Sequence, residues 1–203
     1  MPDLRPSKIV AVGRNYVAHA RELGHEIPTE PLIFLKPPTT VVGDGDSVVY
    51  PAASTNVHHE GELAVVMGQR CHAASIDEAL SFVAGYTCAN DVTARDLQEK
   101  DGQWTRAKGF DTFCPLGPEV VSDLDPGALV VVCRVNGAVR QEGNTSDMLF
   151  GVPQLVAYIS GVMTLEPGDV ILTGTPPGVG PVQRGDEMEV EIVGIGVLHN
   201  RVV

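Results

Sequence analysis

Apolar residues fall in short runs along most of the chain, and Gly, Pro and polar residues separate the runs. Runs of this length that are rich in Val, Ile and Leu are typical of β-strands. An Asn136-Gly137 pair between two such runs indicates a β-hairpin. We therefore expect strands at 8–12, 32–35, 47–50, 58–67, 83–90, 128–135, 138–141, 170–172, 188–193 and 194–203.

Only a few segments have the polar and apolar spacing of helices, and we expect these at 17–23, 75–82, 93–98 and 146–163. Ser75 is a candidate N-cap of the second helix, and Thr145 or Ser146 of the last. Pro153 should kink that last helix. Strands dominate, so we expect a β-rich α+β fold with a rolled sheet and a few short helices.

Composition narrows the class of protein. With 203 residues, of which 43% are hydrophobic, the chain is long enough for one domain, and we expect a single domain over 1–203. A formal net charge of -12 argues against nucleic acid or an anionic membrane as a partner. The four cysteines have no CxxC spacing, and no apolar run is long enough for a signal peptide or a membrane span, so we expect a cytoplasmic protein.

A Glu-x-Glu sequence, Glu60-Gly61-Glu62, opens one of the expected strands. Side chains alternate along an extended chain, so both carboxylates should point the same way, about 7 Å apart. Such a pair is common on solvated strand faces, but a hard divalent cation would relieve its repulsion if it were buried. Asp91 ends the strand at 83–90 and could join the pair, which would suit Mg²⁺ or Mn²⁺.

Further candidates are charged side chains near these carboxylates in the expected fold. Three carboxylates and a divalent cation would leave one negative charge, so an anionic substrate would need nearby cations; Lys108 is a candidate, with Arg14 or Arg106 assisting. His19 and Glu22 lie three residues apart on an expected helix, where a carboxylate could orient an imidazole base.

Two other features are weaker candidates. His58 and His59 adjoin Glu60, but neighbouring strand residues face opposite ways, so both cannot bind one metal ion. The segment 173–180 lacks the spacing and the lysine of a phosphate-binding loop. It could still line a pocket with a hydroxyl group and backbone N–H groups, which suits a carboxylate.

Five segments together resemble the fumarylacetoacetate hydrolase family, and most closely its small acylpyruvate hydrolases and oxaloacetate decarboxylases. The likeness covers nearly the whole chain in order, so that five weak motifs together become specific. The segments are Gly13-Arg14-Asn15-Tyr16, His58-His59-Glu60-Gly61-Glu62-Leu63, the run from Asp91 to Gln98, the run from Arg106 to Asp111, and the run from Leu172 to Gly180.

The resemblance implies a mixed β-roll with the active site at its mouth, and a homodimer. It implies Mg²⁺ or Mn²⁺ as the cofactor and small 2-oxo acids as substrates. The residue roles that it implies are these: Glu60, Glu62 and Asp91 as metal ligands, His19 and Glu22 as a water-activating dyad, Lys108 as the cation for an oxyanion, and Arg14, Gln98 and Thr175 as substrate contacts.

The chain departs from the family pattern at three places. The segments 98–104 and 115–129 are short, and Gly61 stands where a larger residue is more usual. These departures leave the expected metal ligands in place and bear on the substrate range, because loops at the rim of a site set it.

The sequence is compatible with three functions. The first is a metal-dependent hydrolase that cleaves a C–C bond of small 2-oxo acids such as acylpyruvates, or decarboxylates oxaloacetate. The second is an isomerase or decarboxylase of unsaturated oxo-dicarboxylates, of the 2-hydroxyhepta-2,4-diene-1,7-dioate isomerase type. The third is a non-catalytic β-roll that binds a metal ion or metabolite. The presence of both His19 and Glu22 favours the first.

Overall fold

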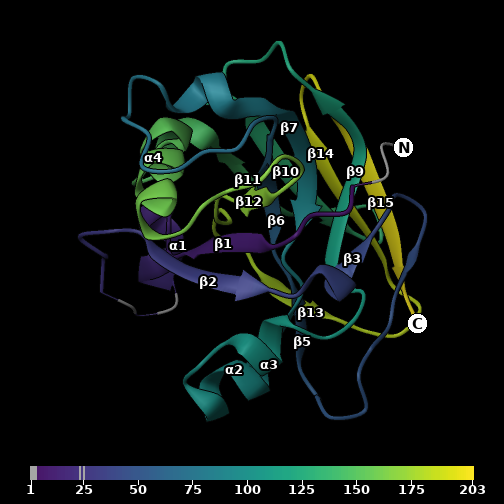
Figure 1. Ribbon diagram of the computed structural model, residues 1–203. Coiled ribbons are helices and arrows are strands. Elements are labelled where there is room, and N and C mark those ends of the chain that lie inside the picture. The colour runs from purple at the N-terminus through teal and green to yellow at the C-terminus, as the bar shows by residue number, and fades with distance from the viewer. Residues whose placement is uncertain (1–3, 23, 25) are drawn as a thin grey trace.

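The computed structural model describes residues 4–22, 24 and 26–203, and consists mainly of strands (Figure 1). Seven strands form the largest sheet. In spatial order they are β2 (Leu32–Lys36), β1 (Ile9–Gly13), β12 (Val170–Leu172), β6 (Gly61–Met67), β7 (Val83–Asn90), β9 (Cys114–Val121) and β3 (Val41–Val42).

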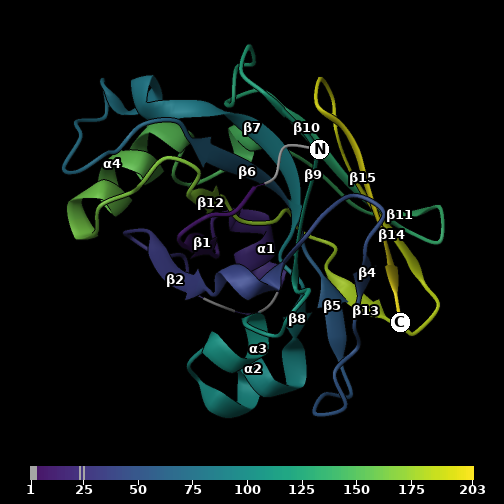
Figure 2. The same ribbon diagram turned by 45° about the vertical axis from the view of Figure 1, so that its right-hand side comes forward.

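A second sheet packs against one face of the first, as the two views of the ribbon show (Figures 1 and 2). Its strands in spatial order are β11 (Ala138–Asn144), β10 (Val130–Val135), β14 (Glu187–Ile192), β15 (Gly196–Val202) and β4 (Ser47–Val48). A small third sheet joins three short strands, β13 (Gly180–Val182), β5 (Val57–His59) and β8 (Thr93–Ala94). The α+β class and the curled sheets expected from the sequence are confirmed.

The helices are short, and the longest has 11 residues. They are α1 (Val17–Glu22), α2 (Arg95–Asp101), α3 (Thr105–Lys108), α4 (Val152–Val162) and the 3-10 segments η1 (Pro38–Thr40), η2 (Ala79–Phe82) and η3 (Thr145–Asp147). In both views α2 and α3 lie together near β2 (Figures 1 and 2). The buried apolar side chains of α4 belong to the main core, with others of β1 and β6. Among the described residues, no helix has the length and apolar character needed to cross a membrane.

The central strands are buried on both faces, which is why most of their positions are apolar. Val10 and Val12 of β1 enter the core between the two large sheets. Ile9 and Ala11 enter a second core on the opposite face. The same alternation along β6 sends Leu63 into the first core. A strand covered on both faces is a rigid base for side chains at its end.

The hairpin prediction is confirmed. β10 and β11 pair across Asn136-Gly137, and both turn residues have positive φ, 52° and 74°. Asn and Gly tolerate this conformation in a tight turn. The strand predicted at 83–90 has the observed bounds of β7.

Three helix predictions were wrong in extent. Only the last four residues of 75–82 are helical, as a 3-10 segment. Thr93 and Ala94, expected in a helix, pair with β5 as β8, and the helix begins at Arg95. The helix expected from residue 146 begins at Val152, where Pro153 occupies the first turn and causes no kink. Leu23, expected to end the first helix, lies outside the described residues.

Candidate active site

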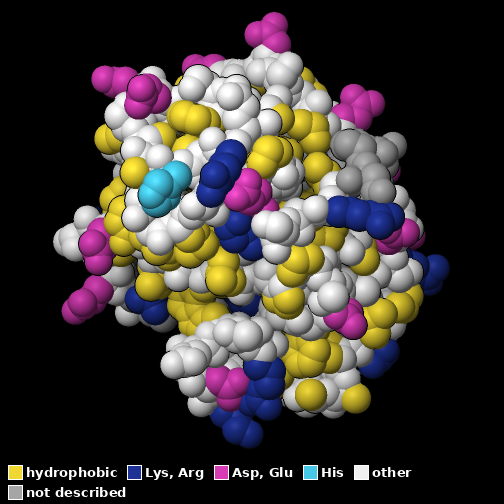
Figure 3. Space-filling model, in the orientation of Figure 1, with side chains coloured by type: hydrophobic (Ala, Val, Ile, Leu, Met, Phe, Trp, Pro, Cys, Tyr) yellow, Lys and Arg dark blue, Asp and Glu magenta, His cyan; other side chains and the backbone are white. Residues whose placement is uncertain are grey.

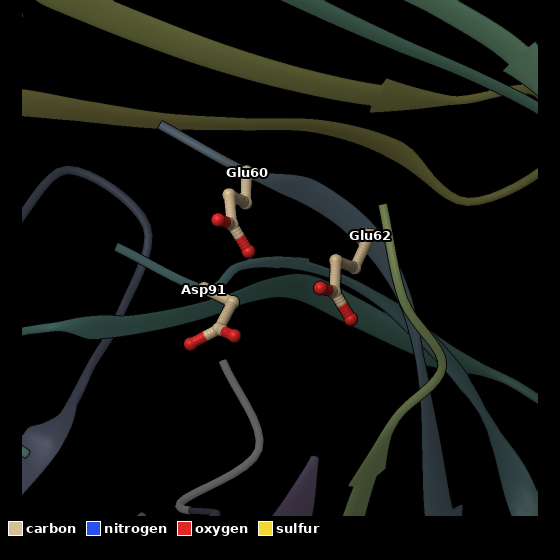
Figure 4. Close-up of side chains that lie close together, drawn as sticks. All are labelled: Glu60, Glu62 and Asp91. Carbon is tan, nitrogen blue, oxygen red and sulfur yellow. The ribbon is translucent and has the colours of Figure 1, made fainter. Parts of the chain in front are cut away.

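Three carboxylates converge where the central strands end. Glu60 lies between β5 and β6, Glu62 is the second residue of β6, and Asp91 follows β7. The antiparallel pairing of β6 with β7 aligns Gly61 with Asn90, which places Asp91 beside Glu60. One oxygen of each carboxylate lies within 4.8 Å of the others. The three side chains point toward a common space (Figure 4).

Three buried cations accompany the three carboxylates. Lys108 Nζ donates to Glu60 Oε2 at 2.7 Å and to Asp91 Oδ2 at 2.5 Å. Lys36 Nζ donates to Asp91 Oδ1 at 2.5 Å, and Arg95 pairs with Glu60 Oε1. The side chains carry three formal charges of each sign, so a divalent cation would make the cluster positive.

Lys108, with Arg14 or Arg106, was predicted to supply the cations near the carboxylates, and this prediction was wrong in part. Lys108 is at the cluster, but Arg106 forms an exposed ion pair with Asp101. Lys36 and Arg95, instead of Arg106, pair with the carboxylates of the cluster, and both are buried. Lys36 ends β2 and Arg95 begins α2, so two segments far apart in the sequence bring these charges together.

The pKa values show how tightly the charges are coupled. Burial and the neighbouring carboxylates Asp91 and Glu60 raise the pKa of Glu62 well above its usual range. Burial also opposes the ionised form of Glu60, but Lys108 and Arg95 outweigh it and lower that pKa. Burial would lower the pKa of Lys108, but Asp91 and Glu60 raise it. Glu62 is thus the carboxylate whose charge the protein's own cations compensate least.

The donor set fits a hard divalent cation. Buried oxygen ligands are what Mg²⁺ and Mn²⁺ prefer. Each carboxylate oxygen has more than one lone pair, so an oxygen that accepts from Lys108 or Lys36 can still bind a metal ion. The unfavourable charge on Glu62 is what such an ion would relieve. The cluster could therefore bind a metal ion through Glu60, Glu62 and Asp91.

A cavity of about 300 Å³ lies over this cluster. Besides the carboxylates it is lined by side chains from the first two strands, from α1, from the α2–α3 region and from the loop after β12. Those used below are Arg14, His19, Phe34, Arg95, Gln98, Trp104, Lys108 and Thr175. Figure 3 shows Lys and Arg side chains on this face of the molecule, some of them set deep near its middle. The cavity is lined by three cationic side chains, Arg14, Arg95 and Lys108, beside four carboxylates.

The predicted dyad lies at the same cavity. His19 Nδ1 is 3.5 Å from Glu22 Oε2, and His19 is buried while Glu22 is partly exposed. The Glu22 carboxylate also accepts from Gly178 N–H at 3.1 and 3.2 Å. Burial lowers the pKa of His19, and the carboxylates of Glu60 and Glu22 offset this in part. His19 is thus held as a neutral imidazole near pH 7, the form in which it can accept a proton.

The three predicted substrate contacts also line the cavity. Gln98 Oε1 accepts from Arg95 at 2.5 Å. Arg14 has a positive φ of 59°, and its guanidinium lies 5.9 Å from the centre of the Trp104 ring. Thr175 is 3% exposed. Eight of the nine predicted side chains thus line one cavity, and the ninth, Glu22, lies beside His19. The role of each stays a prediction.

His58 and His59 do not act together, as expected from strand alternation. His58 Nε2 contacts Asn56 Oδ1 at 3.0 Å, and His59 Nδ1 contacts Gln141 Oε1 at 2.9 Å.

The presence of Gly61 between the two glutamates is explained by the close approach of the two large sheets. A Cβ atom at this position would lie 3.0 Å from Cys133 Cβ.

Several site residues were not predicted. Phe34 and Trp104 form an edge-to-face pair that walls the cavity, with ring centres 5.1 Å apart. Lys36 had one usable signal, a charge directly after an apolar strand, and Arg95 lay inside a recognised motif without an assigned role. Gln141 had none, because its contacts are with residues more than 30 positions away in the sequence.

Known proteins resemble this chain over nearly its whole length. Residues 8–203 match the model of the fumarylacetoacetate (FAA) hydrolase C-terminal family. The mitochondrial oxaloacetate tautomerase FAHD1 of Bos taurus is 49% identical over 193 residues, which cover 92% of this chain and 87% of that protein.

Two solved structures show the same fold. The 5-carboxymethyl-2-hydroxymuconate delta-isomerase from Mycobacterium smegmatis superposes with a TM-score of 0.93 at 54% identity, covering 98% of this chain and 80% of that one. Fumarylpyruvate hydrolase from Pseudomonas aeruginosa, in complex with Mn²⁺ and pyruvate, has a TM-score of 0.92 at 36% identity, covering 97% and 89%. The chain belongs to the fumarylacetoacetate hydrolase family of enzymes.

Proposed function

We propose that the protein is a divalent-metal-dependent enzyme of small 2-oxo acids, with the enol–keto interconversion of oxaloacetate as its leading activity. One observation carries the proposal: the acidic cluster and His19 line a single cavity, and Glu22 Oε2 lies 3.5 Å from His19 Nδ1. The name of the bovine relative, an oxaloacetate tautomerase, supports the choice of substrate. Mn²⁺ with pyruvate in a neighbouring structure supports the metal and the 2-oxo acid class.

In this proposal Glu60, Glu62 and Asp91 hold Mg²⁺ or Mn²⁺. When bound, the ion would supply Lewis-acid stabilisation of negative charge on the 2-oxo oxygen. Lys36, Lys108 and Arg95 offset the charge of the three carboxylates. The loaded cavity would then carry positive charge, which favours a dianion such as oxaloacetate over a monoanion.

His19 is the proposed proton carrier. Conversion of the enol into the keto form removes a proton from the hydroxyl group at C2 and adds one at C3. A neutral imidazole can accept the first proton and then deliver one as an imidazolium ion. Glu22 Oε2 lies 3.5 Å from Nδ1 of the ring, and its negative charge stabilises the protonated form. Lys108, whose ammonium group is buried at the cluster, would stabilise oxygen charge as it develops.

Hydrolysis of an acylpyruvate is the second candidate, and the same pair favours it. His19 oriented by Glu22 can take a proton from water, which attacks the distal carbonyl carbon. The C–C bond then breaks and leaves pyruvate and a carboxylic acid. The fumarylpyruvate hydrolase among the solved neighbours supports this reading. Decarboxylation of oxaloacetate needs the same charge stabilisation without the attacking water.

The test compares these reactions on one preparation. The protein is stripped with EDTA, reloaded with Mg²⁺ or Mn²⁺, and assayed on enol-oxaloacetate, on oxaloacetate for pyruvate release, and on acetylpyruvate and fumarylpyruvate. We expect enol-oxaloacetate to be converted fastest above the buffer rate, and the activity to disappear with EDTA and return with metal. Equal rates in stripped and reloaded protein would refute the metal dependence. Faster acylpyruvate cleavage would favour the second candidate.

Two further expectations belong to this proposal. A homodimer predicts a solution mass twice that of the chain, which sedimentation equilibrium measures directly. The cytoplasmic location expected from composition predicts that the native protein fractionates with the cytoplasm of its source cells.

A further inference from the structure

Gln141 connects the second sheet to the active site from a buried position on β11, where it is 1% exposed. Its amide oxygen accepts from Gly61 N–H at 3.0 Å and lies 2.9 Å from His59 Nδ1. Its amide nitrogen donates to Thr175 Oγ at 2.6 Å and to Pro176 O at 2.8 Å. Both donors and both acceptor positions of this side chain are therefore in use.

The orientation of the amide follows from partners that cannot change their roles. The Gly61 N–H group can only donate, so the amide oxygen must face it. The Pro176 carbonyl can only accept, so the amide nitrogen must face it. A rotated amide would lose both bonds. It follows that His59, facing the oxygen, carries its proton on Nδ1.

The same logic assigns the hydroxyl proton of Thr175. Because the Gln141 NH₂ group donates to Thr175 Oγ, the hydroxyl proton must point elsewhere. It points to Gly61 O, an acceptor 2.9 Å away. The hydroxyl group has one proton and two lone pairs, and these two bonds use the proton and one lone pair. Thr175 lines the cavity, and its Oγ can therefore only accept a further hydrogen bond.

We propose that Gln141 is a positioning residue that makes Thr175 an obligatory hydrogen-bond acceptor for a hydroxyl group of the substrate. The enol form of a 2-oxo acid has a hydroxyl group that the keto form and a bare carboxylate lack. Gln141 thereby gives the cavity a preference for the enol tautomer. The hydroxyl proton points to Thr175 Oγ when the substrate binds, and it must turn to His19 before the proton transfer of the proposed function, because a hydroxyl group has only one proton. The assignment of the hydroxyl group to an enol rests on the proposed function, while the acceptor role of Thr175 rests on geometry alone.

The first experiment is a double-mutant cycle of Gln141→Met and Thr175→Val, with activity on enol-oxaloacetate and the thermal unfolding midpoint as readouts. Each single change should lower kcat/KM by about 10- to 100-fold, since each leaves hydrogen-bonding groups unpaired at the site. The double variant should be no worse than about threefold below the less active single variant, because both single changes remove the same Gln141–Thr175 hydrogen bond. Thr175→Ser, which keeps the hydroxyl group, should recover most of the activity that Thr175→Val loses.

Asn200→Leu is the matched control for loss of a buried amide. Asn200 is 5% exposed, and its amide nitrogen donates to two backbone carbonyls, Gly43 O and Asp46 O, both at the β3–β4 connection. It lies outside the set of residues that line the active-site cavity. We expect this variant to unfold at a lower temperature with unchanged kcat/KM. If Gln141→Met behaves in the same way, or if its effect multiplies fully with that of Thr175→Val, the positioning role is refuted.

A second experiment uses binding without turnover. Trp104 is the single tryptophan of the chain and lines the cavity, so its fluorescence reports ligands added to Mn²⁺-loaded protein. Glycolate has a hydroxyl group that can donate to Thr175 Oγ, whereas oxalate, fully ionised at neutral pH, has none. Thr175→Val should weaken glycolate binding about 10-fold and change oxalate binding less than about twofold. Equal weakening of both would overturn the acceptor assignment.

The two experiments separate this inference from the proposed function. A wild-type protein that binds both ligands and converts no 2-oxo acid would refute the proposed function, and the ligand comparison would still decide the acceptor role. A wild-type protein that converts enol-oxaloacetate while Thr175→Val binds glycolate normally would refute the acceptor role alone. Failure of the wild type to bind either ligand would overturn both.

Discussion

The two sides of the cavity are built in different ways. The acidic cluster is carried by β6 and β7, in the middle of the seven-stranded sheet, and its carboxylates and cations are buried. The His19–Glu22 pair is carried by α1, a helix of six residues, and the Glu22 side chain is 38% exposed. The bond from Gly178 N–H to Glu22 ties this helix to the loop that carries Thr175.

This difference in burial suggests that the cluster side binds the ligands and that the α1 side transfers protons. A buried, doubly covered sheet holds charged groups in place before any ligand arrives, which suits binding of a metal ion and an anionic substrate. A short helix joined to the site through a few polar contacts can be disturbed without disturbing the cluster. Changes on the cluster side should therefore affect metal binding and activity together, and changes on the α1 side should affect activity alone.

The largest effect is expected for Glu62→Gln. This change removes a metal ligand and should lower activity by about 10³-fold or more while abolishing stabilisation by Mn²⁺. Without metal the variant should be at least as stable as the wild type near pH 7. The reason is that the raised pKa of Glu62 means that its ionised form disfavours the folded state once the pH exceeds its ordinary value. Calorimetric Mn²⁺ titration and thermal unfolding measure both effects.

Asp169→Asn provides the opposite case for a buried acid. Burial would raise the pKa of Asp169, but backbone N–H donors and Lys8 outweigh it and lower that pKa. The ionised form therefore stabilises the folded protein above its ordinary pKa, and the variant should lose stability and keep its Mn²⁺ affinity. If Glu62→Gln destabilised the metal-free protein as Asp169→Asn does, the assigned charge balance of the cluster would be wrong.

The next effect is expected for Glu22→Gln on the α1 side. The change removes the charge that supports protonated His19 and should lower kcat by about 10²-fold, with unchanged Mn²⁺ affinity. Arg21→Gln, an exposed change on the same helix, is the control and should leave both quantities unchanged. Wild-type kcat in Glu22→Gln would remove the dyad from the mechanism.

A smaller effect is expected for Gly178→Ala, which tests the tie between α1 and its neighbouring loop. Gly178 has a φ of 97°, and a Cβ atom there would lie 2.1 Å from Arg140 O, so the backbone and the N–H group that binds Glu22 must move. We expect kcat to fall about 10-fold with metal affinity unchanged. Gly185→Ala has nearly the same φ, 96°, in open space, and should be strained without loss of kcat.

The smallest expected effect is a change in the pH profile. Burial lowers the pKa of His19 below 6.5, so the proton-accepting form persists to lower pH and kcat/KM should fall only in a limb below 6.5. The Glu22 carboxylate raises this pKa, so its removal should move the limb to still lower pH. A limb in Glu22→Gln at higher pH than in the wild type would show that another group controls it.

The strands and the acidic motif could be read from local sequence because each depends on neighbouring residues. Alternation along 60–62 is enough to place Glu60 and Glu62 on one side, and a hairpin follows from Asn136-Gly137. The start of the last helix could not be read in this way. Ser146 is a good capping residue, but residues 145–147 form a separate 3-10 turn, and the α-helix begins only at Val152.

By itself, the sequence determined the α+β class and the family, because short-range periodicity and ordered motifs carry that information. The same motifs singled out nine side chains, of which eight line the cavity and Glu22 lies beside His19. The tertiary structure alone decided how their charges are balanced. Lys36, Arg95 and Gln141 reach the site from three separate elements, and their partners are set by strand pairing and sheet packing. Hydrogen-bond roles and pKa values depend on such distances in space, which no local pattern of residues contains.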